Sequence, residues 1–114
     1  MYKTIFHFED EEKIAKLLNN VMNLLDDMEE VNEEITIEVL ANADAVHVFK
    51  KENKDNQADF KKLVQQGVTI CVCQNSLGSR DISEDSLVED IKIVRSGVGE
   101  LTRKQQDGWA YIKI

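Results

Sequence analysis

Five short runs of apolar residues recur along this chain, and longer polar or amphipathic segments separate them. The runs are rich in β-branched and aromatic residues and contain few charges, as is typical of strands with buried faces. They cover residues 2–8, 35–41, 68–73, 91–95 and 109–114. The pattern therefore predicts five β-strands.

The segment after the first of these strands has the clearest helical pattern. Asp10 can cap the helix, acidic residues follow in the first turn where the helix dipole favours them, and apolar residues then recur at helical spacing. These apolar positions are Ile14, Leu17, Leu18, Val21, Leu24, Leu25 and Met28. A long amphipathic helix is predicted here.

Three shorter helices are predicted between the later strands. They cover about residues 42–51, 58–66 and 96–107. Gly67 directly follows the second of them, and glycine is common just past a helix end. The remaining stretch, 74–87, is polar and contains Gly78, so we expect an irregular loop there, of the kind that often has a functional role.

Strands that alternate with helices imply parallel crossover connections. The fold class expected from this order is α/β, a three-layer α/β/α sandwich around a mostly parallel five-stranded sheet. No stretch of the chain has the composition of a linker, and 114 residues are enough to bury one core. We therefore predict a single domain over residues 1–114.

The net charge of −8 is concentrated in the first part of the chain. Residues 1–45 contain 12 acidic and 3 basic residues, whereas residues 46–114 contain 10 and 11. The clustered lysines of the middle segment lie among acidic residues on predicted helices, with few aromatic side chains on which bases could stack. They are Lys50, Lys51, Lys54, Lys61 and Lys62. Nucleic-acid binding is not expected.

The apolar runs are too short to cross a membrane, and the first residues do not resemble a secretory signal. The two cysteines, Cys71 and Cys73, are only two positions apart, so a disulfide between them would close a small, strained ring. A chain with free cysteines fits a reducing compartment. We expect a cytoplasmic protein without membrane association.

Small polar side chains follow several of the predicted strands. In open parallel sheets, ligands bind beyond the carboxyl ends of the strands, where loops and helix N-termini meet. The residues expected at this edge are His7, Asn42, Cys73, Asn75, Ser76, Ser96 and Gly97. We take Cys73 and His7 as candidate catalytic residues and the other five as candidate ligand-binding residues.

The two cysteines have different predicted roles. Cys71 lies in the middle of a strand and is interpreted as a packing residue, whereas Cys73 ends the strand, where backbone N–H groups of the next segment could stabilise a thiolate. Free cysteine is also common in protein cores, so a packed Cys73 stays an alternative. His7 is either a base or a packed histidine, and His47 is interpreted as solvated or hydrogen-bonded outside the site.

The sequence gives no support for a metal or a cofactor. Zinc sites commonly have four ligands in spaced pairs, and neither histidine lies near the cysteines in the sequence. The glycines at 97 and 99 form only a short part of a dinucleotide-binding motif and follow Ser96, a good helix cap. We expect neither a metal nor a cofactor.

Four segments together resemble the DsrE/DsrF-like family, in particular its small, single-domain YchN-like members. These segments are IFHFEDEEKIAKLLNNVMNLL, VLANADAV, CQNSL and SGVGELTRKQQDGWAYIKI. The resemblance extends over nearly the whole chain. One departure lies at the second strand end, where the family has asparagine followed by glycine and this chain has Asn42 followed by Ala43.

The resemblance implies a parallel α/β/α domain that assembles into homo-oligomers, trimers or hexamers. In the branches of the family that act in sulfur oxidation and transfer-RNA thiolation, a cysteine carries sulfur as a persulfide between donor and acceptor proteins. That cysteine matches Cys73. The main hypothesis is therefore a sulfur-relay protein, a persulfide carrier akin to a sulfurtransferase.

Two alternatives belong to other functional classes. The strand-end residues could form a small-molecule-binding pocket that Cys73 merely lines, or the same edge could be a contact in a structural oligomer. An enzyme that uses Cys73 with His7 is a further alternative, although the sequence offers no third residue to orient the pair.

Overall fold

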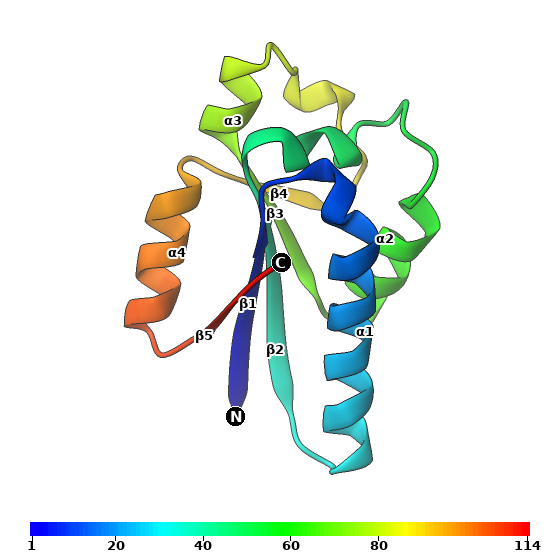
Figure 1. Ribbon diagram of the computed structural model, residues 1–114, viewed down its shortest axis with the longest axis vertical. Coiled ribbons are helices and arrows are strands. Elements are labelled where there is room, and N and C mark those ends of the chain that lie inside the picture. Colours follow the sequence, from blue (N-terminus) through cyan, green and yellow to red (C-terminus); the bar gives the residue numbers. More distant parts are fainter.

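The sheet contains five parallel strands in the order β4-β3-β2-β1-β5 (Figure 1). The computed structural model describes residues 1–114. Its strands are β1 (Tyr2–Phe8), β2 (Ile35–Ala41), β3 (Thr69–Cys73), β4 (Ile91–Val94) and β5 (Ala110–Lys113). All five predicted strands are present, and the predicted parallel sheet is confirmed.

The helices follow the predicted order with two additions, α3 and the short 3-10 segment η3. The α-helices are α1 (Ile14–Glu30), α2 (Gln57–Gln65), α3 (Gln74–Ser79) and α4 (Gly97–Gln106), and the 3-10 segments are η1 (Glu11–Lys13), η2 (Ala43–Phe49) and η3 (Glu84–Ser86). The Asp10 side chain accepts a hydrogen bond from the Glu12 N–H, as expected of a cap.

The expectation of an irregular loop over 74–87 was wrong in its first half. Helix α3 begins directly after Cys73, although its sequence, QNSLGS, has low helix propensity. Leu77 of α3 is only 1% exposed and belongs to the main core. Burial of Leu77 therefore stabilises α3, which also begins directly at the end of β3. The local sequence alone does not predict this helix.

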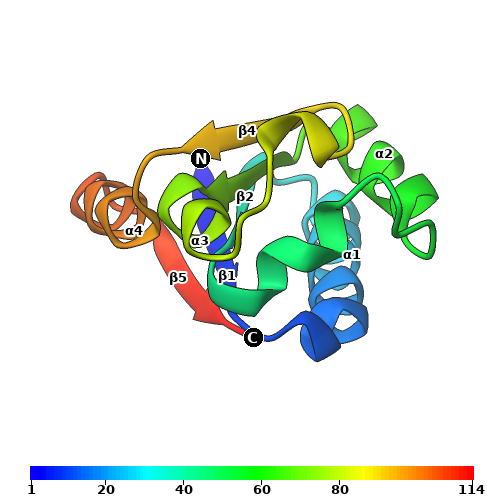
Figure 2. The same cartoon turned by 90° about the horizontal axis from the view of Figure 1, so that it is seen from above.

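The order of the strands determines which face each helix covers. The chain moves in one direction across the sheet from β1 to β4 and then returns past three strands to β5. Because crossovers between parallel strands are right-handed, α1 and α2 lie on one face and α4, on the return, lies on the other. Figure 2 shows these helices on opposite sides of the sheet.

The two faces are very unequal. The main core lies beneath α1 and α2 and contains 18 buried residues, whereas the face beneath α4 has a cluster of five. That smaller cluster consists of Ile5, Leu40, Cys71, Val94 and Leu101. Since side chains alternate along a strand, the α4 face also receives His7, Glu38 and Cys73. The ionisable groups of the sheet are thus concentrated under α4.

Candidate functional site

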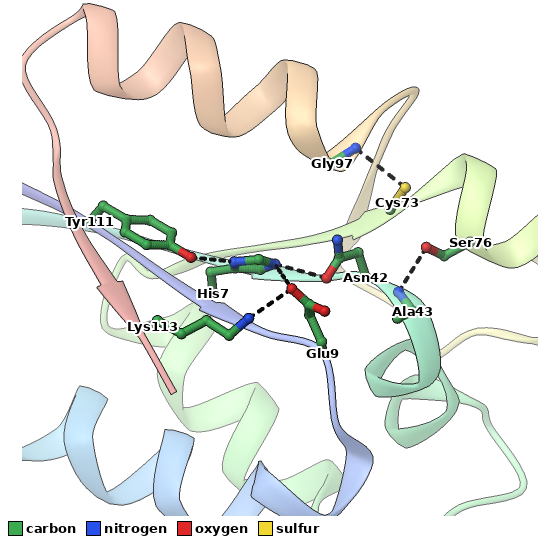
Figure 3. A network of polar contacts seen from close by, with 9 residues as sticks. All are labelled: His7, Glu9, Asn42, Ala43, Cys73, Ser76, Gly97, Tyr111 and Lys113. Carbon is green, nitrogen blue, oxygen red and sulfur yellow. Dashed lines mark hydrogen bonds and ion pairs between the residues drawn. The ribbon is translucent and has the colours of Figure 1, made fainter.

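The site is centred on Cys73, the last residue of β3. The backbone N–H of Gly97, at the start of α4, donates a hydrogen bond to the Cys73 sulfur over 3.3 Å (Figure 3). A side chain at Gly97 would meet the Cβ atoms of Asn42 and Cys73 at 3.4 and 3.5 Å. These are ordinary van der Waals distances, so the start of α4 packs directly against Asn42 and Cys73.

The surroundings of Cys73 favour a thiolate. Burial alone would raise its pKa, but hydrogen bonds from the Ser76 hydroxyl and from the backbone amides of Ser76, Gly97 and Asn75 outweigh burial and hold the pKa below the ordinary cysteine value. The positive end of the α4 dipole acts in the same direction. Cys73 is 5% exposed, so the sulfur lies just below the surface.

Ser76 joins two of the strand-end segments. Its hydroxyl oxygen accepts a hydrogen bond from the backbone N–H of Ala43 over 2.8 Å, which leaves the hydroxyl hydrogen free to point to Cys73. Ala43 has a φ of +52°, a left-handed conformation that suits glycine better than alanine. The turn after β2 thus keeps this backbone conformation although it lacks the expected glycine.

Asn75 contributes to the site through its backbone N–H, and Ser96 contributes by capping a helix. Asn75 has an exposed side chain, and its contribution to the site is its amide N–H. The Ser96 hydroxyl accepts a hydrogen bond from the Gly99 N–H over 3.1 Å and so caps α4. Ser96 therefore fixes the position of the helix start and does not itself face the sulfur.

His7 lies at the centre of a second set of contacts. Its Nε2 lies 2.8 Å from Asn42 Oδ1, and its Nδ1 lies 2.7 Å from the hydroxyl oxygen of Tyr111 on β5 (Figure 3). Because Asn42 Oδ1 can only accept, Nε2 carries the proton and Nδ1 accepts from the Tyr111 hydroxyl. The Asn42 side chain is therefore held by His7 and makes no capping hydrogen bond to η2.

Burial favours the neutral form of His7. Burial lowers the pKa of His7 and outweighs the opposing effect of the hydrogen bond with Asn42. Glu9 lies 3.6 Å from Nε2, but the Lys113 ammonium holds the Glu9 carboxylate at 2.7 Å. A neutral His7 with a fixed tautomer orients Asn42, and the amide nitrogen of Asn42 lies on the side of Cys73 and Gly97 (Figure 3).

The structure thus brings Cys73, Asn42, Ser76 and Gly97 together, with His7 behind Asn42. Three contributors were missed by the sequence analysis, namely Glu9, Tyr111 and Lys113. The last two lie on β5, and the register pairs Lys113 with His7. Alternation along the last strand puts Tyr111 and Lys113 on one face, but only the strand order shows that this face adjoins His7.

Cys71 has the opposite environment to Cys73. It is fully buried, and burial together with the charges of Glu38 and Glu100 raises its pKa to about 12. Glu38 and Glu100 are themselves buried and were also missed by the sequence analysis. His47 is half-buried on η2, outside the contacts described here.

The protein is a small parallel α/β domain in which a cysteine at the end of a strand faces the N-terminus of a helix. The model of the DsrE/DsrF-like family matches residues 3–114. The chain belongs to this family, as its resemblance had indicated. No helix of the structure is long and apolar enough to cross a membrane.

Three solved structures have the same fold over all or nearly all of this chain. A protein of unknown function, MTH1491 from Methanobacterium thermoautotrophicum, is 36% identical with a TM-score of 0.91, and each chain covers 100% of the other. The ychN protein from E. coli is 17% identical over 100% of both chains with a TM-score of 0.83. BT1422 from Bacteroides thetaiotaomicron, also of unknown function, is 17% identical with a TM-score of 0.70, and the match covers 98% of this chain and 94% of that chain. A search of curated proteins found no match.

Proposed function

We propose that this protein carries sulfur as a persulfide on Cys73. The observation that carries the proposal is the contrast between two cysteines on one strand. Backbone and hydroxyl donors hold the pKa of Cys73 below its ordinary value, whereas burial and two carboxylates raise that of Cys71 to about 12. Only Cys73 therefore has the thiolate character that attack on a sulfur atom requires. Family membership supports this chemistry.

The transfer takes place in two balanced steps. The Cys73 thiolate attacks the terminal sulfur of a donor persulfide, the donor S–S bond breaks, and the donor leaves as a thiolate. An acceptor thiolate then attacks the terminal sulfur of the Cys73 persulfide, and Cys73 leaves as a thiolate. The donors that stabilise the thiolate before the first step also stabilise it as the leaving group in the second.

His7 acts in this proposal as a positioning residue. Its Nε2–H donates to Asn42 Oδ1 and so holds the amide group of Asn42 beside Cys73. The N–H groups of that amide can donate to the terminal sulfur once it is attached. Because Cys73 is 5% exposed, entry of a donor requires a small shift of α3 or of the first turn of α4.

Intact mass after incubation with a polysulfide tests the proposal. The wild-type protein and Cys71→Ser should gain one sulfur atom that a reductant removes, whereas Cys73→Ser should gain none. Equal uptake in the two single variants, or no uptake in the wild type, would contradict the proposal. A His7→Ala variant should still accept sulfur but more slowly, because Cys73 keeps its own donors.

The structure does not favour a small-molecule-binding module as the alternative. Four surface hollows are present, and none is lined by Cys73, His7, Asn42 or Ser76. Serine at position 73 should leave affinity for a small ligand largely intact if binding were the function. If Cys73→Ser abolishes sulfur uptake and the protein binds no small ligand, the result supports the persulfide carrier over the binding module.

The proposal also includes a homo-oligomer and partner proteins that supply and receive sulfur. β5 is an edge strand whose residues are all exposed, and edge strands tend to pair or to be covered. The exposed apolar side chains Tyr111 and Ile112 lie on it. Light scattering tests whether the protein is a trimer or a hexamer.

The proposal places the protein in the cytoplasm. The reducing conditions there would keep both cysteines free.

A further inference from the structure

We propose that Glu38, Cys71 and Glu100 form a binding site for a divalent metal ion of the zinc class. One ligand atom from each of these residues lies within 4.8 Å of the other two. The three residues come from β2, β3 and α4, so the site lies between the sheet and the helix that covers it. This inference is independent of the proposed function, since it does not involve Cys73.

The strongest observation is an oxygen atom without a partner. Glu38 is 3% exposed, and when its carboxylate is ionised the buried Oε2 receives no hydrogen bond from the chain. An unpaired buried carboxylate oxygen is costly and rare in folded proteins. A cation bound by Glu38 together with Glu100 and Cys71 would give this oxygen a partner.

Two basic side chains border the cluster. The Lys104 nitrogen lies 3.5 Å from Glu38 Oε1 and 4.0 Å from Glu100 Oε2, and the Arg103 guanidinium lies 4.0 Å from Glu100 Oε1. A divalent ion would take the place of the Lys104 ammonium beside the two carboxylates, and the Cys71 thiol proton would be released to solvent.

Lys104 is placed so that it can give way to an ion. Both of its carboxylate contacts are longer than a good charged hydrogen bond. Its side chain is 26% exposed, and its nitrogen lies 4.5 Å from the ring centre of Trp109. The ammonium is therefore held only loosely between the carboxylates and this ring, so a cation could replace it.

The chemistry of the donors indicates the kind of metal. A set of one thiolate and two carboxylates suits Zn²⁺ better than the hard ions Mg²⁺ and Ca²⁺, which prefer oxygen alone. Tetrahedral zinc places such ligand atoms about 3.5 Å apart, so ligand atoms that lie up to 4.8 Å apart must approach by up to about 1.3 Å on metal binding. Water from the Lys104 side can supply the fourth ligand.

Cobalt titration of the Cys73→Ser variant tests the site, because Cys71 is then the only thiol of the chain. Co²⁺ bound to a thiolate gives a charge-transfer absorption band that Co²⁺ bound to carboxylates lacks. We expect this band at a stoichiometry of one ion per chain, and we expect one equivalent of Zn²⁺ to abolish it. Cys71→Ala in the same background should show no band.

Two further variants distinguish a metal site from a simple ion-pair cluster. Glu100→Gln should weaken Co²⁺ binding at least tenfold, whereas Lys104→Met should strengthen it severalfold, because the competing ammonium is gone. A titration without a thiolate band in both Cys73→Ser and Cys73→Ser/Lys104→Met would overturn the proposal. That result would leave the sulfur uptake of wild-type Cys73 untouched, so the two proposals can fail separately.

Discussion

Replacement of Glu38 by glutamine should remove a large pH dependence of stability. Burial, then a hydrogen bond with Glu100 and the charge of Glu100, raise the pKa of Glu38 from 4.5 to about 7 in the folded protein. The folded state therefore holds this proton more tightly than the unfolded state. The stability contributed by the protonated group is fully present below pH 4.5 and is lost as the pH rises toward 7.

The size of the effect follows from the two pKa values. One pKa unit corresponds to about 1.4 kcal/mol. The difference between 4.5 and about 7 therefore lowers the free energy of unfolding by about 3 kcal/mol above pH 7. Glutamine carries no charge at any pH and should lack this loss. Other groups, such as His7 with its lowered pKa, contribute to both proteins alike and cancel in the comparison.

Urea denaturation at a series of pH values between 4 and 8 measures the effect. A chelator keeps the cluster metal-free, and circular dichroism follows unfolding. Glu33→Gln, in an exposed turn, is the matched control and should behave as the wild type. The reasoning is refuted if the free energy of unfolding of Glu38→Gln falls with pH as steeply as that of the wild type.

Three further predictions concern the site itself. Ser76→Ala should cost about 1 kcal/mol of stability and slow the alkylation of Cys73 at pH 7, because it removes a donor to the sulfur and the acceptor of the Ala43 N–H. Tyr111→Phe should raise the pKa of His7, measured by NMR titration of the ring signals, because the donor to neutral Nδ1 is lost. Ala43→Gly should raise stability by up to about 1 kcal/mol in thermal denaturation, because left-handed alanine costs about 1–2 kcal/mol and the extra freedom of unfolded glycine offsets part of the gain.

Each of these variants has a control on the same chain. Ser86→Ala removes an exposed hydroxyl far from the sulfur and should leave the alkylation rate unchanged. The ring signals of His47 serve as the internal reference for the titration of His7. Ala45→Gly should lower stability, since Ala45 is fully buried and has no left-handed backbone. A stabilised Ala45→Gly, or an unchanged Ala43→Gly, would contradict the argument from backbone conformation.

The sequence was sufficient to predict the layers of the fold because the apolar pattern is strong. Polar or glycine-containing segments separate the apolar runs, and apolar residues recur at helical spacing along α1. The helix α3 was missed because its stability comes from burial of Leu77, which no local pattern shows. Strand order was equally inaccessible, since it depends on contacts between segments far apart in the sequence.

The candidate site was predictable for the residues that follow strands directly. Cys73, Asn42 and Ser76 share one edge because parallel strands end on one side of the sheet. The roles were harder to predict, since Asn42 contacts His7 and does not cap a helix. Glu38 and Glu100 were not singled out in the sequence, and only the packing of α4 on the sheet shows that both are buried beside Cys71.

The contact between His7 and Tyr111 joins residues 104 positions apart. The two ends of the chain must therefore be joined before the Nδ1 of His7 has its partner. The hydrogen bond between Cys73 and Gly97, in contrast, closes over 24 residues within one segment. The group that positions Asn42 thus depends on the whole chain, whereas the donors to the sulfur depend on one part of it.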